Sequence, residues 1–565
     1  MLAITLNPGF VLIVMALTMF ATPRGLRAPA MAGAAMLAMW LLLDHEFGAA
    51  AAVAQMGLPV VLLNLDALNR VFGIAFLIAL VLIAIYSSAR RNRYEDAAIL
   101  LLAGGAVSAL FVGDLVSFVA AVSLAGLAAA WLVFASDQPR ANGAGVRVLV
   151  WHGLEGLLLL AGVAFHISAG AENSVFARLD VRSIGGGFIF AALMIRIGAP
   201  LAHVWLKDAA GHASSVGAVV LSVFPAMLGV YALARLFPAE QLLPWVGAAM
   251  VVVGVMFTAA EDDMRRAAAY GLTAQIGVCV ALIGVGSPLA RAGAEAHAFT
   301  TLFGFMLLQM AWGAVLAGAG ATRMSDLTGL SKAMPLSAAF VFLGGLAGAA
   351  APGFAAYVSL AVALEATAAW DFRWLNALIA GASGALAVCL ALRPALAAYQ
   401  PPLRPTPMKD APFPMLLASA LAAFFCISVG LSPSWLYRLT PTELTFAPYA
   451  LDRLVPQMEL VGAAGAAYLA LRSFGLTIKE RRIRLLDMDA LYRGPVAGAG
   501  RWTGVVLLRV YGALRIGLER SADRSGKLLA ALARACDRPY ADQMSGGVQF
   551  SAICAVLVII LLMGH

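Results

Sequence analysis

Long apolar runs recur along almost the whole chain, separated by short polar or basic segments. A helix needs about 20 apolar residues to cross a bilayer. Runs of suitable length occupy sixteen segments: 2–21, 28–43, 70–88, 97–112, 114–135, 148–169, 187–206, 214–236, 241–259, 267–286, 298–319, 336–366, 374–393, 412–432, 456–473 and 549–563. The pattern predicts an all-α polytopic membrane protein with about 16 transmembrane helices.

Two segments depart from this simple pattern. The run 336–366 is too long for one straight helix and contains GGLAGAAAPGF, so we expect a helix broken near Pro352. The segment 51–66 is apolar but short and ends in Asn64 and Asp66, so we place it at the membrane interface.

Basic residues indicate how the predicted helices are oriented. Loops that follow odd-numbered helices carry 29 Lys and Arg residues, whereas loops that follow even-numbered helices carry 8. Because basic loops tend to stay in the cytoplasm, we expect both chain ends on the non-cytoplasmic side of a bacterial inner membrane.

The last basic stretch differs from the other loops. Residues 472–565 hold 14 basic and 7 acidic residues, and this region carries +7 of the net charge of +8. Its apolar residues recur at helical spacing between the basic residues Arg509, Arg515, Arg520, Arg524, Lys527 and Arg534. We interpret it as an amphipathic lateral helix whose basic residues contact lipid phosphates or partner subunits. The alternative is a solvated tail, which the final apolar run 549–563 disfavours.

Composition excludes several classes of protein. Hydrophobic residues make up 62% of the chain and charged residues 12%, about half the charged share of a soluble domain. This balance excludes a disordered, nucleic-acid-binding or secreted disulfide-rich protein. The five cysteines have no paired spacing, and no phosphate-binding loop, dinucleotide motif, metal-ligand set or nucleophile motif is visible. We therefore expect no cofactor, no metal and no self-contained catalytic site.

An ionisable residue inside a membrane span is costly and suggests function. His152 and Glu155 stand one helical turn apart at the start of the sixth span, where a solvated helix end is the favoured interpretation and a shared proton the alternative. Asp114 opens the fifth span after a glycine, and an N-cap explains it best.

Three further residues are candidates for an ion path. Arg196 stands about halfway along the apolar segment 187–206, and its guanidinium can hold an anion or set a field but cannot release a proton. A packing role with a backbone carbonyl is the alternative. His203, two turns further on, would share its helical face, and His297 stands where the eleventh span begins.

A family resemblance emerges around Arg196. The stretch IRIGAPLAHVWLKDAAGHASSVGAVVLSVFPAMLGVYALARLF resembles the central signature of the antiporter-like subunits of respiratory complex I and the multi-subunit cation/proton antiporters, with the D-type antiporter subunit most similar. EDDMRRAAAYGLTAQIG, AHAFTTLFGFMLLQMAWGAV and LTGLSKAMPLSAAFVFLGGLAGAAAPGFAAYVSL resemble later family segments in the same order. The similarity spans about residues 59 to 370 and implies inverted five-helix repeats with broken helices.

In that family, charged residues at half-membrane depth form a proton axis. The resemblance implies that most of this axis is missing here. The seventh-helix lysine is replaced by Arg196, and only His203 and His297 stand where the family has histidines. The other charged or titratable positions fall on Ser123, Met227, Thr301, Phe305 and Leu360.

The predicted organisation follows the family plan. Residues 1–95 would form three N-terminal helices and 96–393 the antiporter-like core. Helices 14 and 15 would occupy 394–473, the basic cytoplasmic segment 474–548 and the last span 549–565.

Three functional hypotheses remain open. The first is an antiporter-like subunit of a cation/proton antiporter or complex-I-like assembly, with proton conduction reduced or lost and a structural or docking role. The second is an active subunit that moves protons or monovalent cations, for example in a proton-translocating NADH-quinone oxidoreductase. The third is a stand-alone solute transporter. The expected partners are other membrane subunits and the lipid bilayer, and nucleic acid is not among them.

Overall fold

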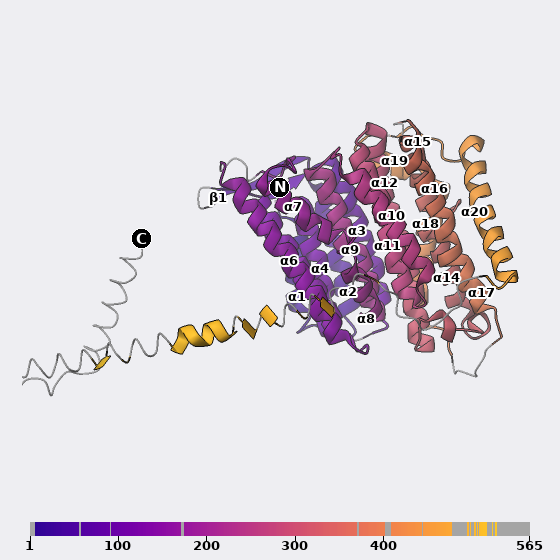
Figure 1. Cartoon of the computed structure of the whole chain (residues 1–565), viewed down its shortest axis with the longest axis horizontal. Helices are drawn as coiled ribbons and strands as arrows, with labels where there is room; N and C mark the ends of the chain where they lie inside the picture. Colours follow the sequence, from indigo (N-terminus) through magenta and orange to yellow (C-terminus); the bar gives the residue numbers. More distant parts are fainter. Residues whose placement is uncertain are drawn as a thin grey trace, which may run out of the picture. The chain divides into compact units, whose positions relative to one another are not determined.

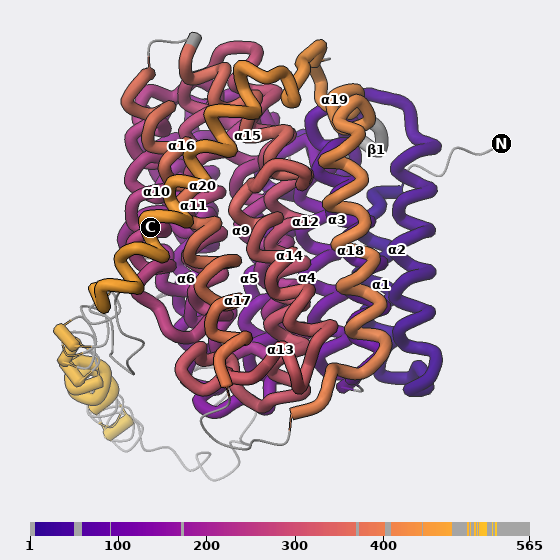
Figure 2. Tube along the Cα trace, turned by 90° about the vertical axis from the view of Figure 1, so that its right-hand side faces the viewer, coloured from indigo at the N-terminus to yellow at the C-terminus, as the bar shows by residue number. Residues whose placement is uncertain are grey.

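The computed structural model of the chain describes residues 6–55, 58–90, 92–170, 175–369, 372–401, 408–442 and 444–476, with scattered positions between 487 and 527. It divides into two compact units, Met1–Leu485 and Leu486–His565. In the first unit, long helices run side by side, with α1 and α2 near one end of the bundle and α20 near the other (Figures 1 and 2).

The α-helices of the first unit are α1 (Pro8–Thr18), α2 (Arg27–Asp44), α3 (Ala67–Ser87), α4 (Arg93–Phe111), α5 (Leu115–Phe134), α6 (Ala141–Ile167), α7 (Ile184–Arg196), α8 (Val204–His212), α9 (Ser215–Leu236), α10 (Leu243–Ala260), α11 (Met264–Val285), α12 (Pro288–Ala319), α13 (Leu330–Ala333), α14 (Pro335–Gly348), α15 (Ala355–Ala369), α16 (Arg373–Ala387), α17 (Arg393–Ala398), α18 (Phe413–Leu431), α19 (Ser434–Leu439) and α20 (Leu451–Ser473). A 3₁₀ turn, Met324–Asp326, precedes α13, and a π-helical turn, Val388–Leu392, joins α16 to α17.

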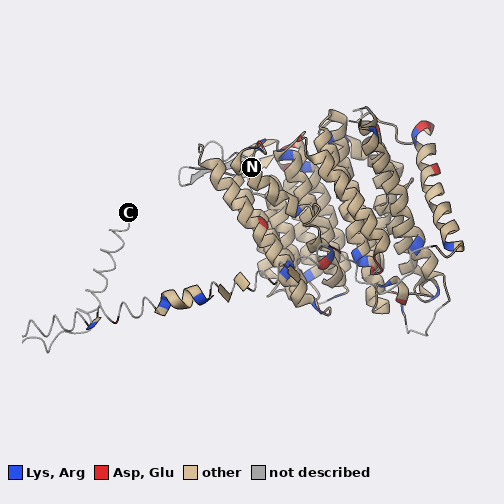
Figure 3. Cartoon of the chain, in the orientation of Figure 1, with Lys and Arg blue, Asp and Glu red and all other residues tan. Residues whose placement is uncertain are grey.

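The helical membrane fold predicted from the apolar runs is confirmed. Eleven described helices are long and apolar enough to cross a bilayer, and four shorter apolar helices accompany them. The count of sixteen stays a prediction, because the last expected span, 549–563, lies outside the described residues. Acidic and basic residues gather mainly toward the ends of the helices (Figure 3), in agreement with the cost of charge in lipid.

Two helices are broken in the membrane region. The expected break near Pro352 is confirmed, because α14 ends at Gly348 and α15 begins at Ala355, with positive φ angles at Ala350 and Gly353. The single span expected at 187–206 is wrong, since α7 ends at Arg196 and Gly198 (φ +69°) starts a turn. Each break falls in the fourth helix of a five-helix block, α4–α9 and α10–α16, as inverted repeats imply.

Among the described residues, one two-stranded sheet departs from an all-α fold. Strands β1 (Gly48–Gln55) and β2 (Leu58–Leu65) pair antiparallel, with Gly48 opposite Leu65. The backbone N–H of Gly113 donates to the Val61 carbonyl, so the hairpin docks at the start of α5. The segment 51–66 is thus part of a hairpin and not a membrane span.

The second unit is described only in part. Residues 508–516 are helical and carry Arg509 and Arg515. Lys527 forms an ion pair with Asp523 at 2.6 Å. Arg520, Arg524, Arg534 and the last expected span lie outside the described residues.

Candidate functional site

A buried ion pair joins α6 to the end of α7. The Arg196 Nε–H donates to Glu155 Oε1 at 2.5 Å, and both residues are at most 1% exposed. The Arg196 Nη2 donates to the Val122 carbonyl of α5 at 3.1 Å. The pair therefore fastens three helices together inside the bundle, where an unpaired charge would be strongly unfavourable.

His152 completes this cluster from the same face of α6. Its Nδ1 lies 2.8 Å from Glu155 Oε2, and its ring centroid lies 4.8 Å from that of Trp205. Because a carboxylate can only accept, Nδ1 carries the hydrogen in this contact and the neutral ring leaves Nε2 as an acceptor. No described atom bonds to this Nε2 or to Arg196 Nη1. The cluster thus presents one open proton acceptor beside a fixed cation.

The favoured interpretation of His152 and Glu155 as a solvated helix end is wrong. Helix α6 begins at Ala141 and not at residue 148, which places both residues near its middle. Arg147 makes this extension possible, because its charge is paired with Asp208 of α8 at 2.5 Å. His152 is 5% exposed and Glu155 is fully buried.

The helix break positions Arg196. Arg196 is the last residue of α7 rather than a mid-helix residue. The Trp205 Nε1–H donates to the carbonyl of the preceding residue, Ile195, at 2.8 Å. A Cβ at Gly229 of α9 would lie 2.7 Å from Arg196 Cγ. Only a glycine therefore leaves room for the arginine stem against α9.

The Glu155 carboxylate lies close to Ser123 of α5, the position at which the family resemblance implies a glutamate. A Cβ at Gly156, the residue after Glu155, would lie 3.3 Å from the hydroxyl of Ser123. Val122, whose carbonyl bonds Arg196, precedes Ser123 in the sequence. The acid missing from α5 thus has a neighbouring counterpart on α6, which a motif comparison along the sequence did not identify.

A second polar cluster surrounds His297 in the other five-helix block. His297 lies ten residues into α12, not at a helix end, and is fully buried. Its Nε2 is 3.0 Å from Gln275 Oε1 and its Nδ1 is 2.9 Å from the Ser359 hydroxyl. The Ser359 and Thr300 hydroxyls are 2.7 Å apart. Both ring nitrogens are therefore occupied, in contrast to those of His152.

This network reaches the broken helix. The Gln275 Nε2 donates to the Gly348 carbonyl, at the last residue of α14, at 3.0 Å. Sequence reasoning missed Gln275, Thr300 and Ser359, although each is a polar residue within an apolar run. A search for any hydrogen-bonding side chain in the spans, rather than for ionisable ones alone, would have found them.

His203 lies apart from Arg196 on a different helical segment. It precedes α8, so the expectation of a shared helical face is wrong. Its ring stands 5.9 Å from the rings of Phe257 and Tyr270, and the Lys207 ammonium lies 5.8 Å from the Tyr270 ring. His203 and Lys207 thus form an aromatic-lined group near the α8 start.

Asp114 is an N-cap, as expected. Its Oδ1 accepts from the Ser117 N–H at 2.8 Å, and its Oδ2 accepts from the Val61 N–H of the hairpin at 2.8 Å. Both carboxylate oxygens accept backbone hydrogen bonds, which favours a structural role for Asp114 over one in an ion path.

The core positions where the family carries charge are apolar here. Met227 and Phe305 are fully buried, and Leu360 is 1% exposed. A Cβ at Gly348 or Gly271 would lie 3.3–3.4 Å from the Phe305 ring, so this ring packs between α11 and the end of α14. Thr301 is buried as well, and its hydroxyl bonds to no described atom.

Two tyrosines, Tyr357 and Tyr437, hold α15 against the segment that follows α18, and a third, Tyr449, ties that segment back to α18. The hydroxyls of Tyr357, Tyr437 and Tyr449 donate to the carbonyls of Pro448, Val358 and Gly430. Burial raises the pKa of Tyr437, which keeps it a donor.

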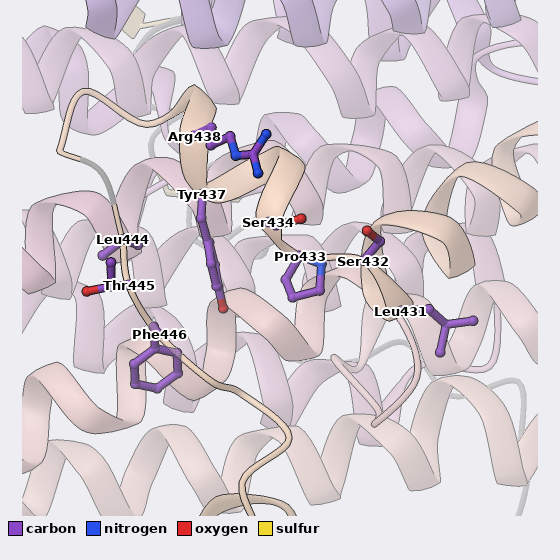
Figure 4. A pocket seen from close by; sticks show the side chains of 9 residues that line it. All are labelled: Leu431, Ser432, Pro433, Ser434, Tyr437, Arg438, Leu444, Thr445 and Phe446. Atoms are coloured by element: carbon purple, nitrogen blue, oxygen red, sulfur yellow. The ribbon is translucent and has the colours of Figure 1, made fainter.

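A cavity of about 530 Å³ lies beside Tyr437 (Figure 4). Its walls also include Pro433, Arg438, Leu444 and Phe446. Tyr437 therefore both bonds to α15 and lines this cavity.

Together, a bundle of membrane helices, two broken helices in repeated positions and buried polar clusters beside each break define a polytopic protein of the antiporter-like class. Residues 112–386 match the family model described as NADH:quinone oxidoreductase/Mrp antiporter, TM. The match covers just under half of the chain, and it is the family that the sequence motifs resemble.

Individual relatives agree with this assignment. NADH-quinone oxidoreductase subunit N of Desulforudis audaxviator (strain MP104C) is 27% identical over 289 residues, which are 47% of this chain and 57% of that protein. The chain thus spans just over half the length of this relative.

Solved structures share the fold. A chain of the Mrp complex from Dietzia sp. DQ12-45-1b has a TM-score of 0.76 at 22% identity, covering 95% of this chain and 64% of that chain. A chain of the membrane-bound sulfane sulfur reductase, an archaeal respiratory membrane complex, has a TM-score of 0.70 at 18% identity, covering 98% and 99%.

Proposed function

We propose that this chain is a D-type antiporter-like subunit of a multi-subunit cation/proton antiporter or complex-I-like assembly, in which proton conduction is reduced or lost and a structural or docking role prevails. The assembly would lie in a bacterial inner membrane, with both chain ends on the non-cytoplasmic side. The relatives named above, which are subunits or chains of such complexes, support membership of an assembly.

The observation that carries this proposal is the apolar core between the two polar clusters. A proton relay needs hydrogen-bonding groups or water at short intervals. Met227 lies two residues from the glycine that packs on Arg196, and Phe305 lies against Gly348 beside the His297 network. In the described part of the chain, we find no hydrogen bond or ion pair from one cluster to the other. The side chains of Met227, Phe305 and Leu360, at positions where the resemblance implies charge, can neither donate nor accept a proton.

A second candidate, an active translocating subunit, is favoured by the His152 cluster. Arg196 bonds to Glu155, and the Nε2 of His152, which bonds to no described atom, offers a local site for a proton. Such a subunit would require water chains to bridge the apolar core.

Proton transport by the reconstituted assembly separates these candidates. The complex, purified through a tag on this chain, is placed in vesicles with a pH-reporting dye. We expect His152→Gln and His297→Ala to leave proton or sodium coupling unchanged, whatever its level. His152→Gln keeps a donor to Glu155 while removing the proton acceptor, so folding is spared.

Loss of coupling in either variant, or in Arg196→Ala, would overturn the structural role, provided that the variant complex elutes intact in size-exclusion chromatography. In that case the second candidate stands.

A further inference from the structure

Helix α20 is the least buried of the membrane-spanning helices that the structure describes. Only 6% of the 18-residue apolar stretch of α20 is buried, compared with at least 33% of the corresponding stretch in each of the other ten helices. It lies at the right-hand edge of the bundle in Figure 1 and in front of the other helices in Figure 2, where that side faces the viewer. Apart from Gln457, every residue of α20 is thus exposed or only partly covered by the residues that the structure describes.

One narrow face fastens α20 to the bundle. Gln457 is its one buried residue, and the Gln457 Nε2 donates to the Ser383 hydroxyl at 2.9 Å. A Cβ at Gly384 of α16 would lie 3.3 Å from the Ala464 Cβ. Ser383 in turn donates to the Ala349 carbonyl at the α14–α15 break. Gln457 and Ala464 thus mark the inward side.

The opposite side carries a carboxylate and small residues. At about 100° per residue, Ala463, Ala466 and Ala470 fall within about 40° of Glu459 around the helix, and Gln457 falls on the far side. All four are exposed. Glu459 has no hydrogen bond or ion pair with any residue that the structure describes.

Glu459 stands well inside the span. Eighteen residues separate Arg453 from Arg472, the basic residues near the two ends of α20. At about 1.5 Å per residue, Glu459 lies about 9 Å along the helix axis from Arg453, in a hydrocarbon layer about 30 Å thick. An unpaired carboxylate facing lipid at this depth is strongly unfavourable, so a complementary group is required.

We propose that the Glu459 face of α20, comprising Glu459, Ala463, Ala466 and Ala470, is the docking surface for a transmembrane helix of another subunit, which places a lysine or arginine opposite Glu459. Alanines let two helix backbones approach closely in a membrane. The inference rests on the proposed membership of an assembly and names the surface and the partner's chemistry.

Other occupants fit less well. A second copy packed on the same face by a two-fold axis would bring two Glu459 carboxylates together. The last apolar run of this chain, residues 549–563, contains no lysine or arginine. Lipid tails offer no partner for a charge.

Photocrosslinking in the intact assembly tests the surface. A benzophenone amino acid replaces Ala466, or replaces Ala249 as a control, because Ala249 is exposed on α10. We expect Ala466 to crosslink to a transmembrane helix of another subunit that carries Lys or Arg within one turn of the contact, and Ala249 to give no such product.

Association measurements supply the energetic test. Glu459→Gln should weaken partner retention in mild detergent roughly three- to thirty-fold, the factor that corresponds to about 0.6–2 kcal/mol for a polar contact between membrane helices. Ala466→Leu should release the partner by steric clash. Asp452→Asn, in the exposed first turn of the same helix, and Ala249→Leu should retain it.

The outcomes are distinguishable. Crosslinks only to lipid, to a second copy or to residues 549–563, or unchanged retention in Glu459→Gln and Ala466→Leu, would overturn the docking surface while the assembly itself stands. If no other subunit co-purifies with the wild-type chain, both the assembly and the docking surface are overturned.

Discussion

Glu155→Gln isolates the charge of the buried ion pair from its hydrogen bonds. The glutamine oxygen can still accept from Arg196 Nε, and its amide can donate to His152 Nδ1 once the neutral imidazole carries its hydrogen on Nε2, so both contacts at 2.5 and 2.8 Å can persist. What the variant removes is the negative charge beside a guanidinium that is 1% exposed. Arginine cannot shed its proton in response.

The expected cost follows from the burial of the pair. Removing one partner of a buried ion pair costs about 3–5 kcal/mol, and the retained hydrogen bonds place Glu155→Gln near about 3 kcal/mol. Arg196→Met should cost less, about 2 kcal/mol, because the unpaired carboxyl group can take up a proton. The double variant has no uncompensated charge and should also cost about 2 kcal/mol. The coupling energy is then about 3 kcal/mol.

A double-mutant cycle measures this coupling. Unfolding of the wild-type chain, both single variants and the double variant is followed by circular dichroism during detergent titration at neutral pH. Additivity of the two single effects within about 0.5 kcal/mol would refute the inferred pairing. A larger loss in Arg196→Met than in Glu155→Gln would refute the asymmetry argument.

Three further predictions concern packing, hydrogen bonding and pH. Gly229→Ala should destabilise the fold by about 1–3 kcal/mol, because its Cβ would lie 2.7 Å from Arg196 Cγ, whereas Gly153→Ala, with open space around it, should melt like the wild type in a thermal shift assay. His297→Leu should cost about 1–3 kcal/mol in the same assay, since it leaves buried amide and hydroxyl groups without their partner. Burial raises the pKa of Glu261, which follows α10. The folded chain therefore holds that proton more tightly than the unfolded chain, and stability should fall as the pH rises from about 4.3 through the raised pKa. Melting temperatures recorded from about pH 4 to 7 should lose this slope in Glu261→Gln, and an unchanged slope would contradict the assignment.

The membrane fold could be predicted because hydrophobic run length is a direct consequence of bilayer thickness. Helix limits were harder to predict. The start of α6 was placed too late because Arg147 reads as a loop residue, and only the fold shows that Asp208 neutralises it. Because the expected start of α6 was too late, His152 and Glu155 were expected at the helix end, whereas they lie near its middle.

The candidate site depends on contacts between distant segments. Arg196 was recognised as a buried charge, but Glu155 is 41 residues away in the sequence, and nothing local links the two. The hydrogen bonds of His297 to Gln275 and Ser359 likewise join three helices. The break after Arg196 could have been predicted, since a glycine and a proline follow within four residues.

The close packing of Arg196 on Gly229 constrains how the sequence can vary. A side chain at position 229 has room only if position 196 carries a thinner or shorter residue, so the two sites should change together among homologues. Glu155 should follow the charge at position 196, whereas Gly153, on an open stretch of the same helix, should vary independently of both. An alignment of homologues should therefore show covariation among positions 155, 196 and 229.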